Sequence, residues 1–162
     1  MNNTIIIHAN PAKGNAQKVE QNAKCYAHWQ EVINLLLDKG FKVIQIAASN
    51  EKIYSDVYTK MNLPFPEISK LCEKADAIIA VDSFMPHLVN LYKVKIPIIV
   101  LWTENDPNIF GYEGHIHLFK DRKYFRPQQY CWRPWGDTVI NQEESIEPEI
   151  VVDTVLKITE NK

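Results

Sequence analysis

Residues 75–107 read ADAIIAVDSFMPHLVNLYKVKIPIIVLWTENDP, and this stretch decides the fold. Ala77 to Val81 is a short apolar run with β-branched residues, which is typical of a strand buried on both faces. Apolar residues at helical spacing follow it, and Ile96 to Trp102 is a second run of the same kind. The pattern therefore predicts a strand, a helix and a second strand that lies parallel to the first.

Polar residues follow the first of these strands. Asp82 and Ser83 come directly after it, and either can cap the helix that begins there. In open parallel sheets, ligands bind beyond the carboxyl ends of the strands. A helix N-terminus at that edge presents free N–H groups and the positive end of its dipole, which suits a phosphate. The sequence thus predicts an anion site around these two residues.

The rest of the chain continues the alternation of strands and helices. Strands are expected at Thr4 to His8, Phe41 to Ala47 and His115 to Phe119, and helices at Tyr26 to Lys39, Ile53 to Met61, Glu67 to Lys74 and Pro148 to Glu160. Gly40 should end the first helix, residues 108–114 should form a loop, and Ile150, Val151, Val155 and Ile158 should face inward in the last helix. This predicts one Rossmann-like α/β domain, residues 1–162, with three layers and a mainly parallel sheet. A flavodoxin-like strand order is the alternative.

The composition of the chain narrows the classes of protein to which it can belong. The chain has 162 residues with 46% hydrophobic and 23% charged residues and a net charge of −2, which favours neither a nucleic-acid binder nor a membrane-surface protein. No apolar run approaches the roughly 20 residues of a membrane span. Cys25, Cys72 and Cys131 are far apart and odd in number, which favours free thiols and a cytoplasmic location.

Two further groups of residues give a less specific indication of function. His115 and His117 would share one face of a strand near Glu113, but no third ligand is evident, so no metal site is expected. Residues 130–135 (YCWRPW) are rich in aromatic side chains, which could stack on a base or sugar but more often pack in a core or at its rim.

Residues 82–88 (DSFMPHL) resemble the D-[ST]-G-x-x-H-L signature of glycosyltransferase family 9, the heptosyltransferase-like enzymes. The preceding KADAIIAVDS and the following VKIPIIVLWTENDP resemble the strands that flank this signature. Residues 23–51 resemble the family's lysine-bearing helix, strand and Glu-bearing turn, and residues 146–158 resemble its closing helix. The likeness runs from Thr4 to Ile158.

The resemblance implies half of a two-domain enzyme. Members of the family have the GT-B architecture, and this chain resembles only the C-terminal domain, which holds the nucleotide diphosphate sugar. The implied activity is metal-independent glycosyl transfer of hexosyl or heptosyl type without a cofactor. The acceptor domain would be missing, or supplied in trans by a homodimer or by a separate N-terminal-domain subunit.

The resemblance also assigns catalytic residues. Lys24 would neutralise the charge that develops on the leaving phosphate, with Lys13 as its rival for this place. His87, in the first turn of the signature helix, would donate a hydrogen bond near the phosphate or sugar.

The remaining implied residues bind the donor. They are Asp82, Ser83, Phe84 and Met85 at the diphosphate, Glu51 at the ribose, and Thr103, Asn105 and Asp106 along the cleft. A helix-terminal charge is an equal alternative for Glu51, and a plain turn is favoured for the loop of Asp106. The family has glycine where this chain has Phe84, whose ring must turn away or partly cover the site. The alternative function is therefore a non-catalytic nucleotide-binding or protein-interaction module.

Overall fold

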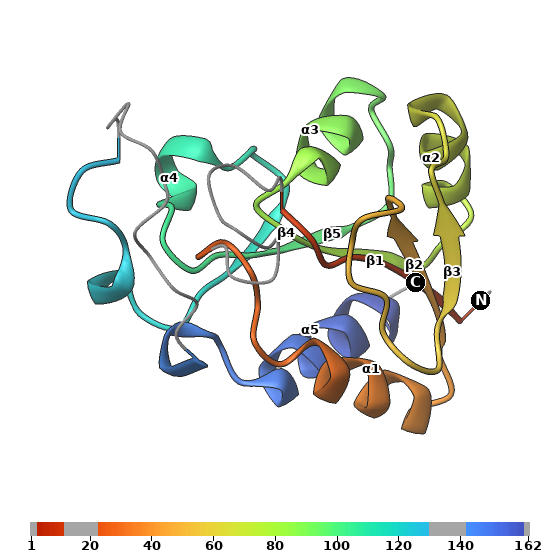
Figure 1. The fold of residues 1–162 in the computed structure, drawn as a ribbon, viewed down its shortest axis with the longest axis horizontal. Helices are drawn as coiled ribbons and strands as arrows, with labels where there is room; N and C mark the ends of the chain where they lie inside the picture. The colour runs from red at the N-terminus through yellow and green to blue at the C-terminus, as the bar shows by residue number, and fades with distance from the viewer. Residues whose placement is uncertain (1–2, 12–22, 130–141, 161–162) are drawn as a thin grey trace.

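The computed structural model describes residues 3–11, 23–129 and 142–160, and within them the chain forms a six-stranded parallel sheet (Figure 1). The strand order is β3-β2-β1-β4-β5-β6. The strands are β1 (Thr4–His8), β2 (Lys42–Ala47), β3 (Tyr58–Met61), β4 (Ala77–Val81), β5 (Ile98–Leu101) and β6 (Ile116–Leu118). This is the Rossmann order, so the predicted fold class is confirmed and the flavodoxin-like alternative is wrong.

Helices cover both faces of the sheet and complete three layers. α1 (Trp29–Asp38) and α5 (Pro148–Glu160) pack on one face, and α2 (Phe65–Cys72) and α3 (Phe84–Leu91) pack on the other (Figure 1). A one-turn helix, α4 (Pro107–Phe110), follows β5. None of the helices in the described ranges combines the length and apolarity that a membrane span requires.

The core follows from the period of two along each strand. In β4, Ile79 packs toward α1 and α5, whereas Ile78 packs toward α2 and α3, and both are fully buried. β1 alternates in the same way, with Ile6 beside Ile78 in register. Strands buried on both faces read as continuous apolar runs, which explains why the sequence located β1 and β4 at their observed bounds.

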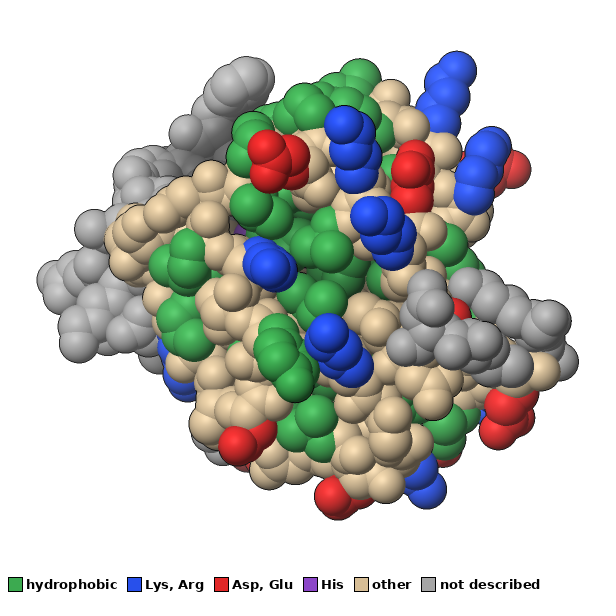
Figure 2. All heavy atoms as spheres, turned by 90° about the vertical axis from the view of Figure 1, so that its right-hand side faces the viewer, with side chains coloured by type: hydrophobic (Ala, Val, Ile, Leu, Met, Phe, Trp, Pro, Cys, Tyr) green, Lys and Arg blue, Asp and Glu red, His purple; other side chains and the backbone are tan. Residues whose placement is uncertain are grey.

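Residues 53–61 were expected to form a helix, and that prediction is wrong. They lead into β3, which pairs with β2 and forms the edge of the sheet. Asp56 takes a left-handed backbone conformation with φ of 62°, which a continuous helix does not allow. Figure 2 shows the side of the molecule on which β3 lies, with apolar side chains interrupted by basic ones. Lys42 lies 4.6 Å from the centre of the Tyr58 ring, a placement that protects an exposed edge strand.

Two smaller predictions near the C-terminal half also need correction. The loop expected at 108–114 begins with α4, because the Asp106 side chain accepts a hydrogen bond from the Asn108 N–H and caps one helical turn. Ile150 does not face inward but is 44% exposed, because the buried face of α5 is formed by Pro148, Val151, Val152, Val155 and Thr159. The predicted end of α1 is confirmed, since Gly40 follows it with φ of 82°.

Candidate functional site

The strand order places a topological switch point between β1 and β4. The chain leaves β1 toward one edge of the sheet and leaves β4 toward the other, so the connections after these two strands diverge. His8 ends β1, and Asp82 and Ser83 follow β4. Because His8 is in register with Ala80, the two chain ends emerge side by side. The anion site predicted from the sequence therefore lies at the position where open α/β sheets bind ligands.

Ser83 is the residue that caps α3. Its side chain accepts a hydrogen bond of 3.4 Å from the Met85 N–H, and its backbone is extended. Its Oγ also lies 2.9 Å from Nδ1 of His8. The Met85 side chain is fully buried in the core, so at this helix start only its backbone can face a ligand.

His8 is a member of this site that sequence reasoning missed. Only 1% of it is exposed, and burial lowers its pKa to about 4, so its ring is neutral at pH 7. The available signal was a polar residue at the last position of an apolar strand whose carboxyl end faces the predicted site.

Asp82 is the centre of a chain of polar contacts. Its Oδ2 lies 2.8 Å from Nζ of Lys24, and the same oxygen accepts a hydrogen bond from Nδ2 of Asn105. Asn105 in turn accepts a hydrogen bond of 2.8 Å from Arg126, whose Nε lies 3.9 Å from a carboxylate oxygen of Glu104. The structure therefore brings three predicted residues together, Lys24, Asp82 and Asn105, and adds Glu104 and Arg126, which were not predicted.

Thr103 connects this chain of contacts to the segment that carries Lys24. Its hydroxyl donates a hydrogen bond to the carbonyl oxygen of Ala23, directly before Lys24 in the sequence. Thr103 and Ala23 are both buried. The loop after β5 thus fixes the backbone from which Lys24 reaches Asp82.

The Phe84 ring lies beside this helix start. It meets the His8 ring edge-on at 4.4 Å between ring centres and stacks on Phe65 at 5.3 Å. Phe84 is half-buried and Phe65 is 53% exposed. The sequence left open whether the Phe84 ring turns away from the helix start or partly covers it. In the structure the ring lies against His8 and points toward Phe65 of α2.

Glu51 lies at the carboxyl end of β2, as expected, where its carboxylate accepts a hydrogen bond of 2.8 Å from the Ala48 N–H. Burial raises the pKa of Glu51, and the Ala48 N–H and the Asn10 side chain oppose that rise. Asn10 follows β1, so Glu51 belongs to the same sheet edge as Ser83. Its contacts hold the turn after β2 and do not join the contacts around Asp82.

Two predicted residues have structural partners of their own. Asp106 caps α4 and forms an ion pair of 2.7 Å with Arg122, which agrees with the turn favoured from the sequence. His87 is exposed, and its Nδ1 lies 2.7 Å from the Tyr112 hydroxyl. The structure therefore places His87 with Tyr112 and not among the contacts of Asp82.

The histidines near β6 have little capacity for a metal. His117 Nδ1 accepts a hydrogen bond from the indole N–H of Trp102 at 3.1 Å, so the ring proton is on Nε2, which donates to the Tyr112 carbonyl oxygen. Both nitrogens of His117 are therefore occupied in a neutral ring. No group of three His, Cys, Asp or Glu side chains suited to a metal occurs within residues 3–11, 23–129 and 142–160.

Some residues singled out from the sequence lie outside the described ranges. They are Lys13, the rival of Lys24, and the aromatic run at residues 130–135 with Cys131. The other two cysteines, Cys25 and Cys72, are buried.

No protein-family model matches the chain, and no curated protein matches it. Solved structures do match. The ADP-heptose LPS heptosyltransferase II of E. coli superposes with a TM-score of 0.67 and 14% identity over 98% of this chain and 46% of its own. The E. coli heptosyltransferase WaaC with ADP gives a TM-score of 0.65 and 12% identity over 95% and 44%, respectively.

A third match is TibC from enterotoxigenic E. coli, described as an iron-containing dodecameric glycosyltransferase. It has a TM-score of 0.64 and 16% identity over 98% of this chain and 45% of TibC. The chain thus spans less than half the length of these three proteins. At such identities the likeness establishes the fold, and at that level the resemblance to heptosyltransferases is confirmed.

Proposed function

We propose that this chain binds a nucleoside diphosphate or its sugar conjugate at the carboxyl edge of the sheet, with the diphosphate at the start of α3. The observation that carries the proposal is the capped N-terminus of α3 at the switch point between β1 and β4. Backbone N–H groups and the positive helix end at such a position favour a phosphate. The heptosyltransferase fold, and a match crystallised with ADP, support this choice of ligand.

Lys24 would provide the positive charge that balances the ligand. The ammonium now contacts the Asp82 carboxylate at 2.8 Å, and both side chains retain some solvent exposure. A diphosphate would compete with Asp82 for Lys24, while Asn105 keeps a hydrogen bond to the carboxylate. Lys24 would then stabilise the negative charge on the departing diphosphate during transfer.

The proposed reaction is glycosyl transfer from a nucleotide diphosphate sugar, in a reducing cytoplasm, to an acceptor held by another domain or subunit. His87 is exposed on the same helix as the proposed diphosphate site and would have to exchange its contact with Tyr112 for one to the sugar or phosphate. Glu51 would face the ribose from the end of β2. Thr103, Asp106 and Phe84 would shape the cleft mainly through the contacts described above.

Calorimetric titration tests the binding step. The purified chain would be titrated with ADP, GDP, UDP, CDP and dTDP, and then with sugar conjugates of whichever nucleotide binds. We expect saturable binding to at least one nucleotide and a roughly tenfold weaker affinity in Ser83→Ala and Lys24→Gln, which corresponds to about 1.4 kcal/mol each. Ser55→Ala, a change at an exposed turn serine, is the matched control. Absence of binding to all five nucleotides would refute the donor site.

A second candidate function is a nucleotide-binding or protein-interaction module without catalysis. It is favoured by the Phe84 ring, which lies where the family signature has glycine and covers His8. Release of free sugar or transfer to added acceptors, followed by chromatography, separates the two functions. Nucleotide-sugar binding with no turnover in the presence of candidate acceptors and partner subunits would favour the module.

A further inference from the structure

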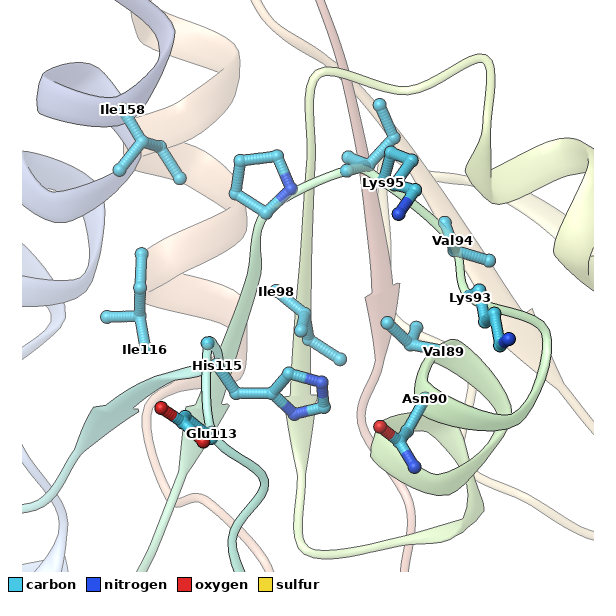
Figure 3. A pocket seen from close by; sticks show the side chains of 13 residues that line it. Val89, Asn90, Lys93, Val94, Lys95, Ile98, Glu113, His115, Ile116 and Ile158 are labelled. Carbon is cyan, nitrogen blue, oxygen red and sulfur yellow. The ribbon is translucent and has the colours of Figure 1, made fainter.

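A cavity of about 550 Å³ lies at the amino ends of β5 and β6, whereas Ser83 lies at the carboxyl end of β4 (Figure 3). Its walls come from the end of α3, the loop of residues 93–97 before β5, residues 113–116 at the start of β6, and Ile158 in α5. Residues 93–97 and 113–115 lead into β5 and β6, whereas the proposed diphosphate site follows strands. The volume is within the range of about 300–1,000 Å³ that small-molecule sites occupy. The cavity is therefore separate from the site described above and large enough for a ligand.

Apolar side chains line much of the cavity. Side chains from four different elements meet there, and they are Val89, Val94, Ile98, Ile116 and Ile158. Val89, Val94 and Ile98 are buried, and the other two are half-buried. Figure 3 shows Ile158 and Ile116 on one side and Val89 on the other, with Ile98 between them. A hydrocarbon group placed here would cover the apolar surface that Ile116 and Ile158 still expose, above the buried Val89 and Ile98.

Two lysines lie along the rim. Lys93 and Lys95 are exposed, and neither forms an ion pair with another described residue. Lys93 directly follows the C-cap of α3 with φ of 53°, a left-handed conformation that glycine or asparagine adopts at lower cost. Glu113 lies across the cavity from both lysines in Figure 3, so the positive charge is concentrated on the α3 side.

A third polar group points into the same space. The His115 ring extends from its backbone toward Val89 and Asn90 in Figure 3. Its Nδ1 is buried and has no hydrogen-bond partner among the described residues. Buried polar atoms in native proteins almost always have a partner, so this nitrogen is available to a polar atom of a molecule in the cavity.

We propose that this cavity binds a small amphipathic anion, with its apolar body against Ile116 and Ile158 and its carboxylate or phosphate beside Lys93 and Lys95. His115 provides a hydrogen bond to a polar atom of the ligand. The carboxylate of Glu113 disfavours the opposite orientation, since it would repel the anionic head. The site is independent of nucleotide binding at the other edge of the sheet.

Octanoate is a suitable probe, because it combines a short hydrocarbon chain with one carboxylate. The full chain, labelled with ¹⁵N, would be titrated while amide resonances are followed by NMR. We expect saturable shifts confined to residues 89–98, 113–116 and the end of α5. Acetate lacks the apolar body and octan-1-ol lacks the charge, so each should bind at least fivefold more weakly.

Variants locate the site. Lys93→Gln combined with Lys95→Gln should weaken octanoate binding at least fivefold, whereas Lys60→Gln, an exposed lysine on β3, should leave it unchanged. Ile158→Phe should fill part of the cavity and weaken binding while the amide spectrum elsewhere stays native. No saturable shift at these residues, equal affinity for octan-1-ol, or unchanged binding in the double lysine variant would each overturn the proposal.

Discussion

Ser83 joins the fold to the proposed chemistry at the scale of single residues. The same hydroxyl oxygen accepts the Met85 N–H and contacts Nδ1 of buried His8. A ligand that takes this hydroxyl must compete with His8, whose ring is neutral at pH 7 because burial lowers its pKa. The geometry at the start of α3 therefore depends on His8, which belongs to β1.

Substitution of Ser83 by alanine should destabilise the fold by about 1–2 kcal/mol. The change removes the α3 cap and leaves Nδ1 of His8 without its oxygen partner. Urea denaturation followed by far-UV circular dichroism measures the loss, with Ser55→Ala as the control at an exposed turn. Equal midpoints for the two variants would contradict this account of the cap.

His8 should also make stability depend on pH. The pKa of His8 is about 4 in the folded protein against an ordinary value of 6.5, so between these values the unfolded chain binds the proton and the folded chain does not. Stability should therefore fall as pH falls, by about 2 kcal/mol between pH 7 and pH 5 from this residue alone. Urea midpoints of wild type and His8→Asn measured across that range isolate its share. Parallel curves for the two proteins would show that His8 does not titrate as described.

The sequence placed at this edge of the sheet the candidate residues that follow apolar strands, namely Asp82, Ser83 and Asn105. Asp82 and Ser83 directly follow the apolar run of β4, and Asn105 comes a few residues after that of β5. Since the carboxyl ends of parallel strands meet at the same side of a sheet, their position could be predicted. Arg126 reaches Asn105 from a segment without such a pattern, and only the tertiary structure brings the two together. His8 was counted as part of a strand, which concealed its polar role.

At the scale of elements, the turn between α4 and β6 is held by close packing around Gly111. A Cβ at this position would lie 2.5 Å from the Pro107 carbonyl oxygen and 2.6 Å from Cε1 of His117. The His117 ring is itself fixed by Trp102 and by the Tyr112 carbonyl, so it cannot move away without loss of those hydrogen bonds. The turn thus needs glycine for space, not for an unusual backbone angle.

Gly111→Ala should therefore destabilise the protein by about 1–3 kcal/mol, the usual cost of an overpacked site. Thermal unfolding compared with Asn108→Ala, a change at an exposed position of α4, provides the measurement and the control. We also expect altered indole fluorescence of Trp102, because its N–H partner would shift. A melting temperature equal to that of the control would show that the turn relaxes freely.

β3 illustrates why elements at the sheet edge are harder to predict than central ones. Its four residues are mostly exposed, so they lack the continuous apolar run that identified β1 and β4. Its pairing with β2 decides the conformation, and a pairing between distant segments leaves little trace in local sequence. The central strands carry that trace because both of their faces are buried.

At the scale of the whole molecule, the central question is whether a chain with less than half the length of its structural matches is sufficient to bind a nucleotide. The switch point, the α3 N-terminus and the pair of Lys24 and Asp82 all lie within this chain. None of these three features would bind the acceptor of the proposed transfer. Binding and transfer should therefore be separable, with binding retained by the chain alone.

Nucleotide binding by the isolated chain should raise its melting temperature. A ligand at a hundred times its Kd stabilises the folded state by about 2.7 kcal/mol, which corresponds to roughly 5–11 °C for a domain of this size. Differential scanning fluorimetry with ADP, the nucleotide in one of the matched structures, is the first measurement, and the other nucleoside diphosphates follow. Adenosine is the control without phosphates, and Ser83→Ala is the control without the cap. A shift of equal size with adenosine, or an undiminished shift in Ser83→Ala, would show that the start of α3 does not bind the diphosphate.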